Sequence, residues 1–489
     1  MRSATSSDDG EAQISSVIGT QSRLESNERL HVVILAVLSV MVLFTDASIK
    51  ELHGTAVFYA SLVREIIDTG DPLLIYTDDR AYLLKPPLVV WLSTLSCKVF
   101  GLNNFGVTFV SRFAGVGVVL LSYALIRRWW SHPVAWLAAF AILTNSTFVQ
   151  FTATLRMDSL LMFGLLLSVV GWAYRDANWG AAALFGGITI AVLSKGPLGF
   201  AAAPLILAHA LLLRSSPLPT KGWRWSLLLL PIVAWYATLA GFHGAKPFVE
   251  LSEDTLRGTA TPQLEVWQSF YQEYLVKPAR RYWPWLPFMV IGAIIAIRRI
   301  FDSQLVRDMR IHYLWVLLWV LVVLAAAALK PDHDIRYLYP ALPVLGLFTG
   351  LAITKITGDR LPTWGPITML VVISVVILLH EYNPKPGRDT RTTIAAIRAA
   401  SEGSKEMLAI GGYPVPPRQP RRQNTHRDWV HFYIGAVPRV LSWSEVQDLR
   451  PDMSNGVFLT ESLGHQDRLA EFDLDPKFIT NEMIFAVPK

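Results

Sequence analysis

The sequence has a single cysteine, Cys97, in a chain of 489 residues. One cysteine excludes an intrachain disulfide bond and a cysteine-based metal site, and we expect Cys97 to pack as a small apolar residue. The sequence also contains no P-loop, no GxGxxG phosphate-binding motif, no cluster of zinc ligands and no internal repeat. No standard nucleotide or zinc motif therefore marks a functional site.

Charged residues are scarce as well, at 17% of the chain, whereas 52% of the residues are hydrophobic. The mean hydropathy is +0.37. A soluble domain would not carry so many apolar runs, so the composition predicts a mainly α-helical polytopic membrane protein in contact with membrane lipid. The net charge of +6 comes largely from basic residues in short loops between apolar runs, and this distribution argues against nucleic acid as a partner.

Apolar runs of spanning length follow one another along most of the chain, and a spanning helix needs roughly 20 apolar residues. Residues 1–29 are polar and lack the apolar core of a signal peptide, so we expect a disordered cytoplasmic tail before a retained first anchor at 30–46. The other candidate spans are 106–126, 133–153, 158–174, 178–194, 197–213, 223–242, 284–298, 311–329, 338–355 and 364–381.

The apolar run 86–101 decides the predicted topology. It is short, and Ser93, Ser96 and Lys98 interrupt it. If this run does not span, the loops that carry most of the basic residues lie on the cytoplasmic side, as the positive-inside rule requires. If it does span, the same loops face outward. We therefore interpret it as a juxtamembrane or re-entrant helix, which gives about eleven spans within a range of about 11–13 for the fold.

This topology divides the chain into a transmembrane domain at 30–382 and an extracytoplasmic domain at 383–489. In the first extracytoplasmic loop, 46–87, apolar residues recur at helical spacing from Val57 to Ile67, which is typical of a helix lying on a membrane surface. Residues 243–283 are expected to form an aromatic loop of mixed charge. The C-terminal pattern predicts a small α/β domain, with strands at 406–410, 456–460 and 478–487 and helices at 391–401, 443–449 and 465–472.

Polar clusters gather at the outer face under this topology. They lie in the loop 46–87, at Arg156–Asp158, at Ser194–Pro197 and between Lys330 and Tyr339. Charges at membrane depth are costly and usually functional. The alternative is that each charge is solvated at headgroup level and caps a helix, and Asp158 in particular suits the N-cap of the helix that it opens.

These clusters favour the transfer of a group from a lipid phosphate. A phosphate leaving group needs Lys or Arg to neutralise its developing charge, and an acceptor hydroxyl needs a carboxylate base, for which Asp158 is the best-placed candidate. A lone loop histidine such as His333 is more often solvated than functional. The candidate substrate-binding residues are Lys85, Arg156, Lys195, Lys330, His333, Arg336 and Tyr337.

The order of these elements resembles the GT-C integral-membrane glycosyltransferases, especially the aminoarabinose transferase (ArnT) and protein mannosyltransferase-like group. Together the matching stretches cover about residues 30–380, and the KPP, RxDS-LL and SKGP pieces are specific as a set. The stretches are YASLVREIIDTGD (59–71), AYLLKPPLVVWL (81–92), FVSRFAG (109–115), TLRMDSLLMFGLLL (154–167), LSKGPLGF (193–200), RYWPWLPF (281–288) and IRYLYPALPVL (335–345).

The resemblance implies an enzyme of the bacterial plasma (inner) membrane that uses a polyprenyl-phosphate sugar as donor. It implies a site on the extracytoplasmic face and an acceptor that is a lipid such as lipid A, a glycan or a protein. The family residues that carry over to this chain are Asp158, Lys85, Lys195 and Arg336.

The first loop departs from the family pattern. Thr55 and Ala56 stand where the family has a carboxylate pair, and Leu84 replaces an acidic residue before the lysine of the KPP motif. Two hypotheses follow. The protein is either an active transferase or a catalytically inactive GT-C-like scaffold that binds a lipid-linked sugar or assists a partner. Participation of a divalent metal ion stays open. The first-loop carboxylates that would replace the missing pair are Asp46, Glu51 and Asp79.

Overall fold

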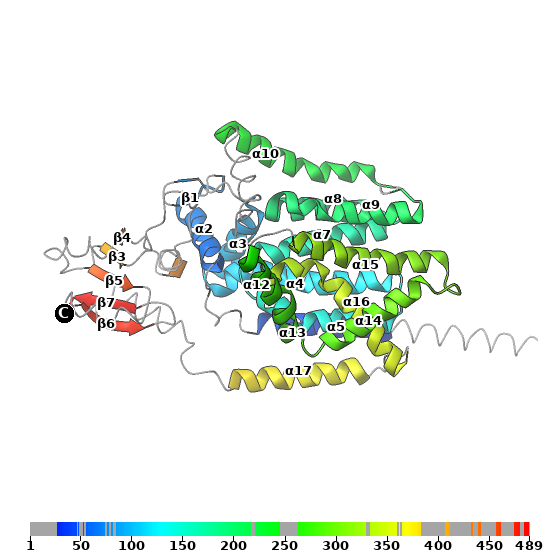
Figure 1. Ribbon diagram of the computed structural model, residues 1–489. Coiled ribbons are helices and arrows are strands. Elements are labelled where there is room, and N and C mark those ends of the chain that lie inside the picture. The colour runs from blue at the N-terminus through cyan, green and yellow to red at the C-terminus, as the bar shows by residue number, and fades with distance from the viewer. Residues whose placement is uncertain are drawn as a thin grey trace, which may run out of the picture. The chain divides into compact units, whose positions relative to one another are not determined.

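The computed structural model of the protein (Figure 1) divides into two compact units. The first comprises Met1–Thr45, Phe113–Phe151 and Asp158–Tyr382, and the second comprises Asp46–Arg112, Thr152–Met157 and Asn383–Lys489. The residues that the structure describes are 27–45, 47, 52, 55–73, 76–77, 80–81, 85–216, 221–244, 263–328, 333–358, 361, 364–382, 406–410, 432–433, 439–441, 456–460, 474–479 and 484–488.

The first unit is a bundle of helices (Figure 1), and most of them are apolar on every side, as expected for helices surrounded by lipid and by one another. Its helices are Asn27–Phe44, α4 (Asn104–Arg127, shared with the second unit), α5 (His132–Leu143), α6 (Ser146–Thr152), α7 (Met157–Ala173), α8 (Gly180–Lys195), η1 (Gly196–Ala201), α9 (Ala202–Leu213), η2 (Trp223–Leu229), α10 (Leu230–His243), α12 (Gln263–Tyr271), η3 (Gln272–Val276), α13 (Lys277–Arg281), α14 (Leu286–Ile300), α15 (Arg307–Ala328), η4 (Ile335–Ala341), α16 (Leu342–Thr357) and α17 (Trp364–Tyr382).

Within the described residues, six helices are long and apolar enough to cross a membrane, or up to eight if each bent pair counts as one span. This count joins α8 and α9 into one helix and covers only the described residues, so the number of eleven spans stays a prediction. The helix α7 has only 17 residues, and the predicted spans at 133–153 and 284–298 belong to pairs bent by 61° and 106°. The helix α3 (Leu88–Phe100) has 13 residues and is too short to span, which agrees with the non-spanning interpretation of 86–101.

The predicted spans 178–194 and 197–213 form one continuous helical run, Gly180–Leu213, that turns back on itself at η1. Gly196 has a φ of +73°, which ends α8, and Pro197 cannot continue it. A Cβ atom on Gly199 would lie 2.2 Å from the backbone nitrogen of Val192. Residues seven apart lie about 10 Å apart along a straight α-helix, so η1 folds over the last turns of α8, and only glycine permits this approach.

Glycines also set the packing of α7 against α8. A Cβ atom on Gly164 would lie 2.6 Å from the backbone nitrogen of Ala191, and one on Gly171 would lie 2.3 Å from that of Leu184. Small residues let helix backbones approach this closely inside a membrane. Because the two contacts advance in opposite directions along the helices, α7 and α8 are antiparallel, and the start of α7 lies beside the end of α8.

The segment 243–283, predicted as a loop, is helical where it is described. It contains α12, the π-helix η3 and α13 in direct succession. The apolar positions Phe270 and Tyr274 lie one helical turn apart and pack edge to face, with ring centroids 5.2 Å apart. This spacing of apolar residues is typical of an amphipathic helix.

The second unit contains α2 (Thr55–Thr69), the helix predicted in the first loop. Its apolar side is buried in protein from Ala56 to Ile66, so protein covers the face that was expected to contact the membrane surface. The helix α3 follows after the short antiparallel strands β1 (Tyr76–Thr77) and β2 (Arg80–Ala81). Cys97 on α3 is 4% exposed, which confirms its packing as a small apolar residue.

The C-terminal part of this unit contributes a five-stranded mixed sheet in the order β4-β3-β5-β7-β6. Two strands coincide with the predicted ranges, but the single strand expected at 478–487 is replaced by an antiparallel pair. The three helices expected here lie outside the described residues, so the α/β domain stays a prediction. The strands are β3 (Glu406–Ile410), β4 (Arg439–Leu441), β5 (Gly456–Thr460), β6 (Leu474–Ile479) and β7 (Ile484–Pro488).

Candidate functional site

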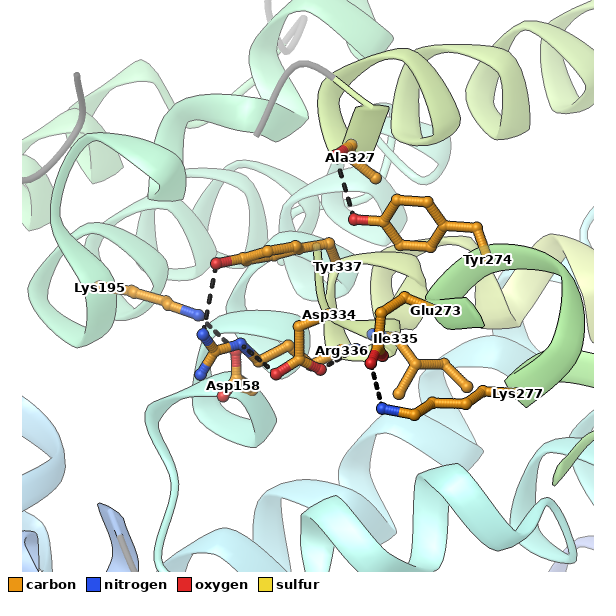
Figure 2. A network of polar contacts seen from close by, with 10 residues as sticks. All are labelled: Asp158, Lys195, Glu273, Tyr274, Lys277, Ala327, Asp334, Ile335, Arg336 and Tyr337. Atoms are coloured by element: carbon orange, nitrogen blue, oxygen red, sulfur yellow. Dashed lines mark hydrogen bonds and ion pairs between the residues drawn. The ribbon is translucent and has the colours of Figure 1, made fainter. Parts of the chain in front are cut away.

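Asp158 and Lys195 form an ion pair between the start of α7 and the end of α8 (Figure 2). Only 12% of the Asp158 side chain and 15% of the Lys195 side chain are exposed. The helix dipole favours a negative charge in the first turn of α7 and a positive charge in the last turn of α8. Because α7 begins at Met157, Asp158 lies inside the first turn and not at the N-cap that was the alternative for it.

Arg336 lies beside this ion pair, at the start of η4 (Figure 2). Asp334 caps η4, because its Oδ1 accepts a hydrogen bond from the Arg336 backbone N–H at 2.9 Å. Its Oδ2 lies 3.2 Å from Nε of the same arginine. The guanidinium also donates to the Tyr337 hydroxyl at 3.3 Å and lies 5.1 Å from the centre of that ring. The cap residue and the next side chain along the helix therefore orient Arg336.

A second ion pair, between Glu273 and Lys277, lies on the η3–α13 segment (Figure 2). The second carboxylate oxygen of Glu273 accepts a hydrogen bond from the Ile335 backbone N–H at 3.1 Å. The neighbouring residue, Tyr274, donates its hydroxyl to the carbonyl of Ala327 at 3.0 Å. This segment therefore contacts both the end of α15 and the start of η4.

The cluster combines cationic and anionic groups in a partly buried position. Lys195 and Arg336 carry positive charge beside the carboxylates of Asp158 and Asp334. Such cations can neutralise a phosphate group, and a carboxylate can accept a proton from a hydroxyl. Among the residues that the structure describes, no group of three or more His, Cys, Asp or Glu is arranged to hold a metal ion.

The structure brings together the predicted residues Asp158, Lys195, Arg336 and Tyr337, which come from distant parts of the sequence (Figure 2). Lys85 and Arg156 belong to the second unit. The remaining predicted residues, Asp46, Glu51, Asp79 and Lys330, lie outside the described residues, as does Asp78.

His333 is buried, with 8% of its surface exposed, so the expectation of a solvated loop histidine is wrong. Its ring packs edge-on against Phe270 at 5.6 Å and against Tyr274 at 5.4 Å. The role of His333 in substrate binding stays a prediction.

Sequence patterns did not predict the contacts of two charged residues, Glu273 and Arg112. Glu273 lies in a stretch that was interpreted as a loop, and no local signal connects it with Ile335. Arg112 is 1% exposed and donates to the carbonyl of Ala153 at 2.8 Å and to the Thr108 hydroxyl at 3.1 Å. Its signal was available, because an arginine inside an apolar run of a membrane protein is costly and needs partners.

Comparison with known sequences agrees with the fold. The family described as dolichyl-phosphate-mannose-protein mannosyltransferase matches residues 84–237. An undecaprenyl phosphate-alpha-4-amino-4-deoxy-L-arabinose arabinosyl transferase of Shewanella sediminis is 23% identical over 318 residues, which are 62% of this chain and 56% of that protein. The protein of the same description from Pseudomonas aeruginosa strain UCBPP-PA14 is 26% identical over 61% of this chain and 54% of its own length. The chain thus spans little more than half the length of these curated relatives.

Solved structures match over nearly the whole chain. The apo crystal structure of ArnT from Cupriavidus metallidurans has a TM-score of 0.65 and 15% identity, with 93% of this chain and 97% of that chain covered. The oligosaccharyltransferase AglB from Archaeoglobus fulgidus has a TM-score of 0.53 and 13% identity, with 89% and 69% covered. The protein therefore has the fold of these membrane transferases, and it resembles the GT-C glycosyltransferases of the ArnT and mannosyltransferase group.

Proposed function

We propose that the protein is a membrane glycosyltransferase that moves a sugar from a polyprenyl phosphate to a lipid, glycan or protein acceptor. The observation that carries the proposal is the cluster of Asp158, Lys195 and Arg336, partly buried where α7, α8 and η4 meet. A solved ArnT structure bound to undecaprenyl phosphate shares the fold, with a TM-score of 0.61. Lipid-linked phosphate is the substrate class that both the cations of the cluster and this likeness favour.

The reaction breaks the bond between the anomeric carbon of the sugar and the phosphate oxygen, and it forms a bond from that carbon to an acceptor oxygen or nitrogen. The departing phosphate gains negative charge, which Lys195 and Arg336 would neutralise by charge-assisted hydrogen bonds. Asp158 would take the proton that the acceptor loses. Lys85 and Arg156, which belong to the second unit and precede α3 and α7, stay predicted substrate-binding residues.

The experiment that tests this proposal is transfer from a panel of radiolabelled undecaprenyl-phosphate sugars by the full-length protein in bacterial lipid nanodiscs. We expect one donor to be consumed with release of undecaprenyl phosphate, and transfer to depend on Asp158. The alternative function is an inactive scaffold that binds the lipid-linked sugar, which Thr55 and Ala56 favour because they replace the carboxylate pair of the family. Saturable donor binding without turnover of any sugar would support that alternative.

We also propose that the cluster faces the extracytoplasmic side of the plasma membrane and that the N-terminus is cytoplasmic. Basic residues mark the other end of the same helices. Arg128 donates to the carbonyl of Ala173, at the far end of α7 from Asp158, at 3.2 Å. Arg307 donates to the carbonyl of Leu212, near the end of α9, at 3.1 Å. The positive-inside rule favours that end as the cytoplasmic one.

A further inference from the structure

Two consecutive residues of η3 contact the end of α15 and the start of η4, the helix that carries Arg336. Tyr274 donates to the carbonyl of Ala327 near the end of α15, and Glu273 accepts from the N–H of Ile335 at the start of η4. The chain between these anchors carries Asp334, the cap of η4. Figure 2 shows Arg336 directed away from both contacts, toward Asp158 and Lys195.

The local geometry gives Glu273 direct influence on the arginine. The first N–H groups of a helix have no partner inside the helix, and the N–H of Ile335 receives one from a residue far away in the sequence. Ile335 itself is 2% exposed, so water is a poor substitute. The next residue is Arg336, whose backbone position depends on this peptide plane.

The burial of Glu273 and its two contacts favour this role. Its side chain is 15% exposed, whereas the side chain of its ion-pair partner Lys277 is 43% exposed. One carboxylate oxygen pairs with Lys277 and the other accepts from Ile335. The residue lies on a π-helix, a rare distortion that is frequent at functional sites. The more buried contact is the hydrogen bond to Ile335, and the lysine pair is peripheral to it.

We propose that Glu273 is a positioning residue that holds Arg336 in the orientation in which it binds the donor phosphate. This inference rests on the proposed function. The carboxylate would act only through the start of η4, without touching the donor. Removal of Glu273 should therefore weaken phosphate binding through Arg336 and leave the contribution of Lys195 intact.

The test measures binding of undecaprenyl phosphate to the full-length protein in nanodiscs by native mass spectrometry. Glu273→Ala should weaken binding about tenfold, as expected for loss of a charge-assisted contact. Glu273→Gln retains an oxygen that can accept from Ile335 and should recover most of that loss. Lys277→Ala removes the exposed ion pair alone and should leave binding within about twofold of the wild type.

The deciding measurement is the double variant Glu273→Ala/Arg336→Ala. If Glu273 acts through Arg336, the double variant binds no more weakly than Arg336→Ala, whereas independent effects multiply. Thermal unfolding of each variant separates a local effect from loss of fold. If Glu273→Ala melts well below the wild type, Glu273→Gln takes its place in the test. A Glu273→Gln protein that is as stable as the wild type but binds as weakly as Glu273→Ala would contradict the inference.

The outcomes separate this inference from the proposed function. If the wild type does not bind undecaprenyl phosphate at all, both are wrong. In a second outcome, the wild type binds and Arg336→Ala weakens binding. If Glu273→Ala then binds like the wild type, or its effect multiplies with that of Arg336→Ala, only the positioning role of Glu273 is wrong. If Arg336→Ala binds like the wild type, the role of Arg336 fails first, and that of Glu273 fails with it.

Discussion

Asp158 is the residue at which the chemical and the structural interpretations can be separated most clearly. Its carboxylate is paired with Lys195 and lies in the first turn of α7. Asn at this position keeps the side-chain shape and the ability to accept a hydrogen bond, but it cannot take up a proton. We expect Asp158→Asn to fold and to lose transfer on the order of 100-fold or more, because general-base catalysis contributes about 10² to 10⁴. Single-turnover transfer at saturating donor measures this loss.

The control for Asp158→Asn addresses the lysine that the substitution leaves without a charged partner. The double variant Asp158→Asn/Lys195→Gln removes both charges and should restore thermal stability without restoring transfer. Wild-type turnover in Asp158→Asn would show that the carboxylate is a structural partner of Lys195 and that the catalytic assignment is wrong.

Lys195 should contribute mainly to donor binding. Replacing a charged hydrogen-bond donor to phosphate typically costs about 1.5–3 kcal/mol, so we expect Lys195→Gln to raise the KM for the donor about tenfold or more. Lys355, an exposed lysine in the last turn of α16, provides the matched control, and Lys355→Gln should leave the KM unchanged. The measurement is the initial transfer rate as a function of donor concentration. If Lys195→Gln and Lys355→Gln have equal KM values for the donor, Lys195 is a partner of Asp158 and does not bind the donor.

At the scale of elements, adjacent glycines on α8 give a matched test of the packing that forms the site. A Cβ atom on Gly187 would lie 2.6 Å from the carbonyl oxygen of Gly164, whereas one on Gly186 would lie 3.5 Å from its nearest neighbour, a methyl carbon of Leu228. Gly187→Ala should destabilise the protein by about 1–3 kcal/mol, because it forces α7 and α8 apart. Gly186→Ala should be neutral or slightly stabilising, since alanine favours helix more than glycine does.

The same pair of variants reports on the site, because separating α7 from α8 also separates Asp158 from Lys195. Transfer activity should therefore fall with Gly187→Ala and stay near wild type with Gly186→Ala. Melting temperature and initial transfer rate are the two measurements. If both variants behave alike, the close contact of these helices does not determine the geometry of the ion pair.

At the scale of the whole molecule, the proposed orientation makes a prediction about accessibility. In a Cys97→Ala background, single cysteines in place of Asp78 and Val430 should react with a membrane-impermeant maleimide added to intact cells. Cysteines in place of Arg127, Thr220 and Leu305 should react only after the membrane is opened. Asp158 and His333 are too buried to serve as reporters. Labelling of position 220 in intact cells would contradict both the orientation and the extracytoplasmic site.

The sequence by itself determined the helical, membrane-embedded character of the protein and the position of its charged residues at helix ends. Hydrophobic runs, prolines and glycines act on their own neighbours, so these features can be predicted locally. The helix α2, the short helix α3 and the turn after Lys195 all follow from such signals. The bends inside two predicted spans did not follow, because an apolar run does not reveal whether its helix bends.

Only the tertiary structure decided which charged residues meet. Asp158 faces Lys195 because glycine contacts fix how far α7 slides along α8, and a shift of one turn would move a side chain by about 5.4 Å. Glu273 reaches Ile335 across a separation of 62 residues. Such pairings depend on the packing of distant backbones, which no local pattern in the sequence specifies.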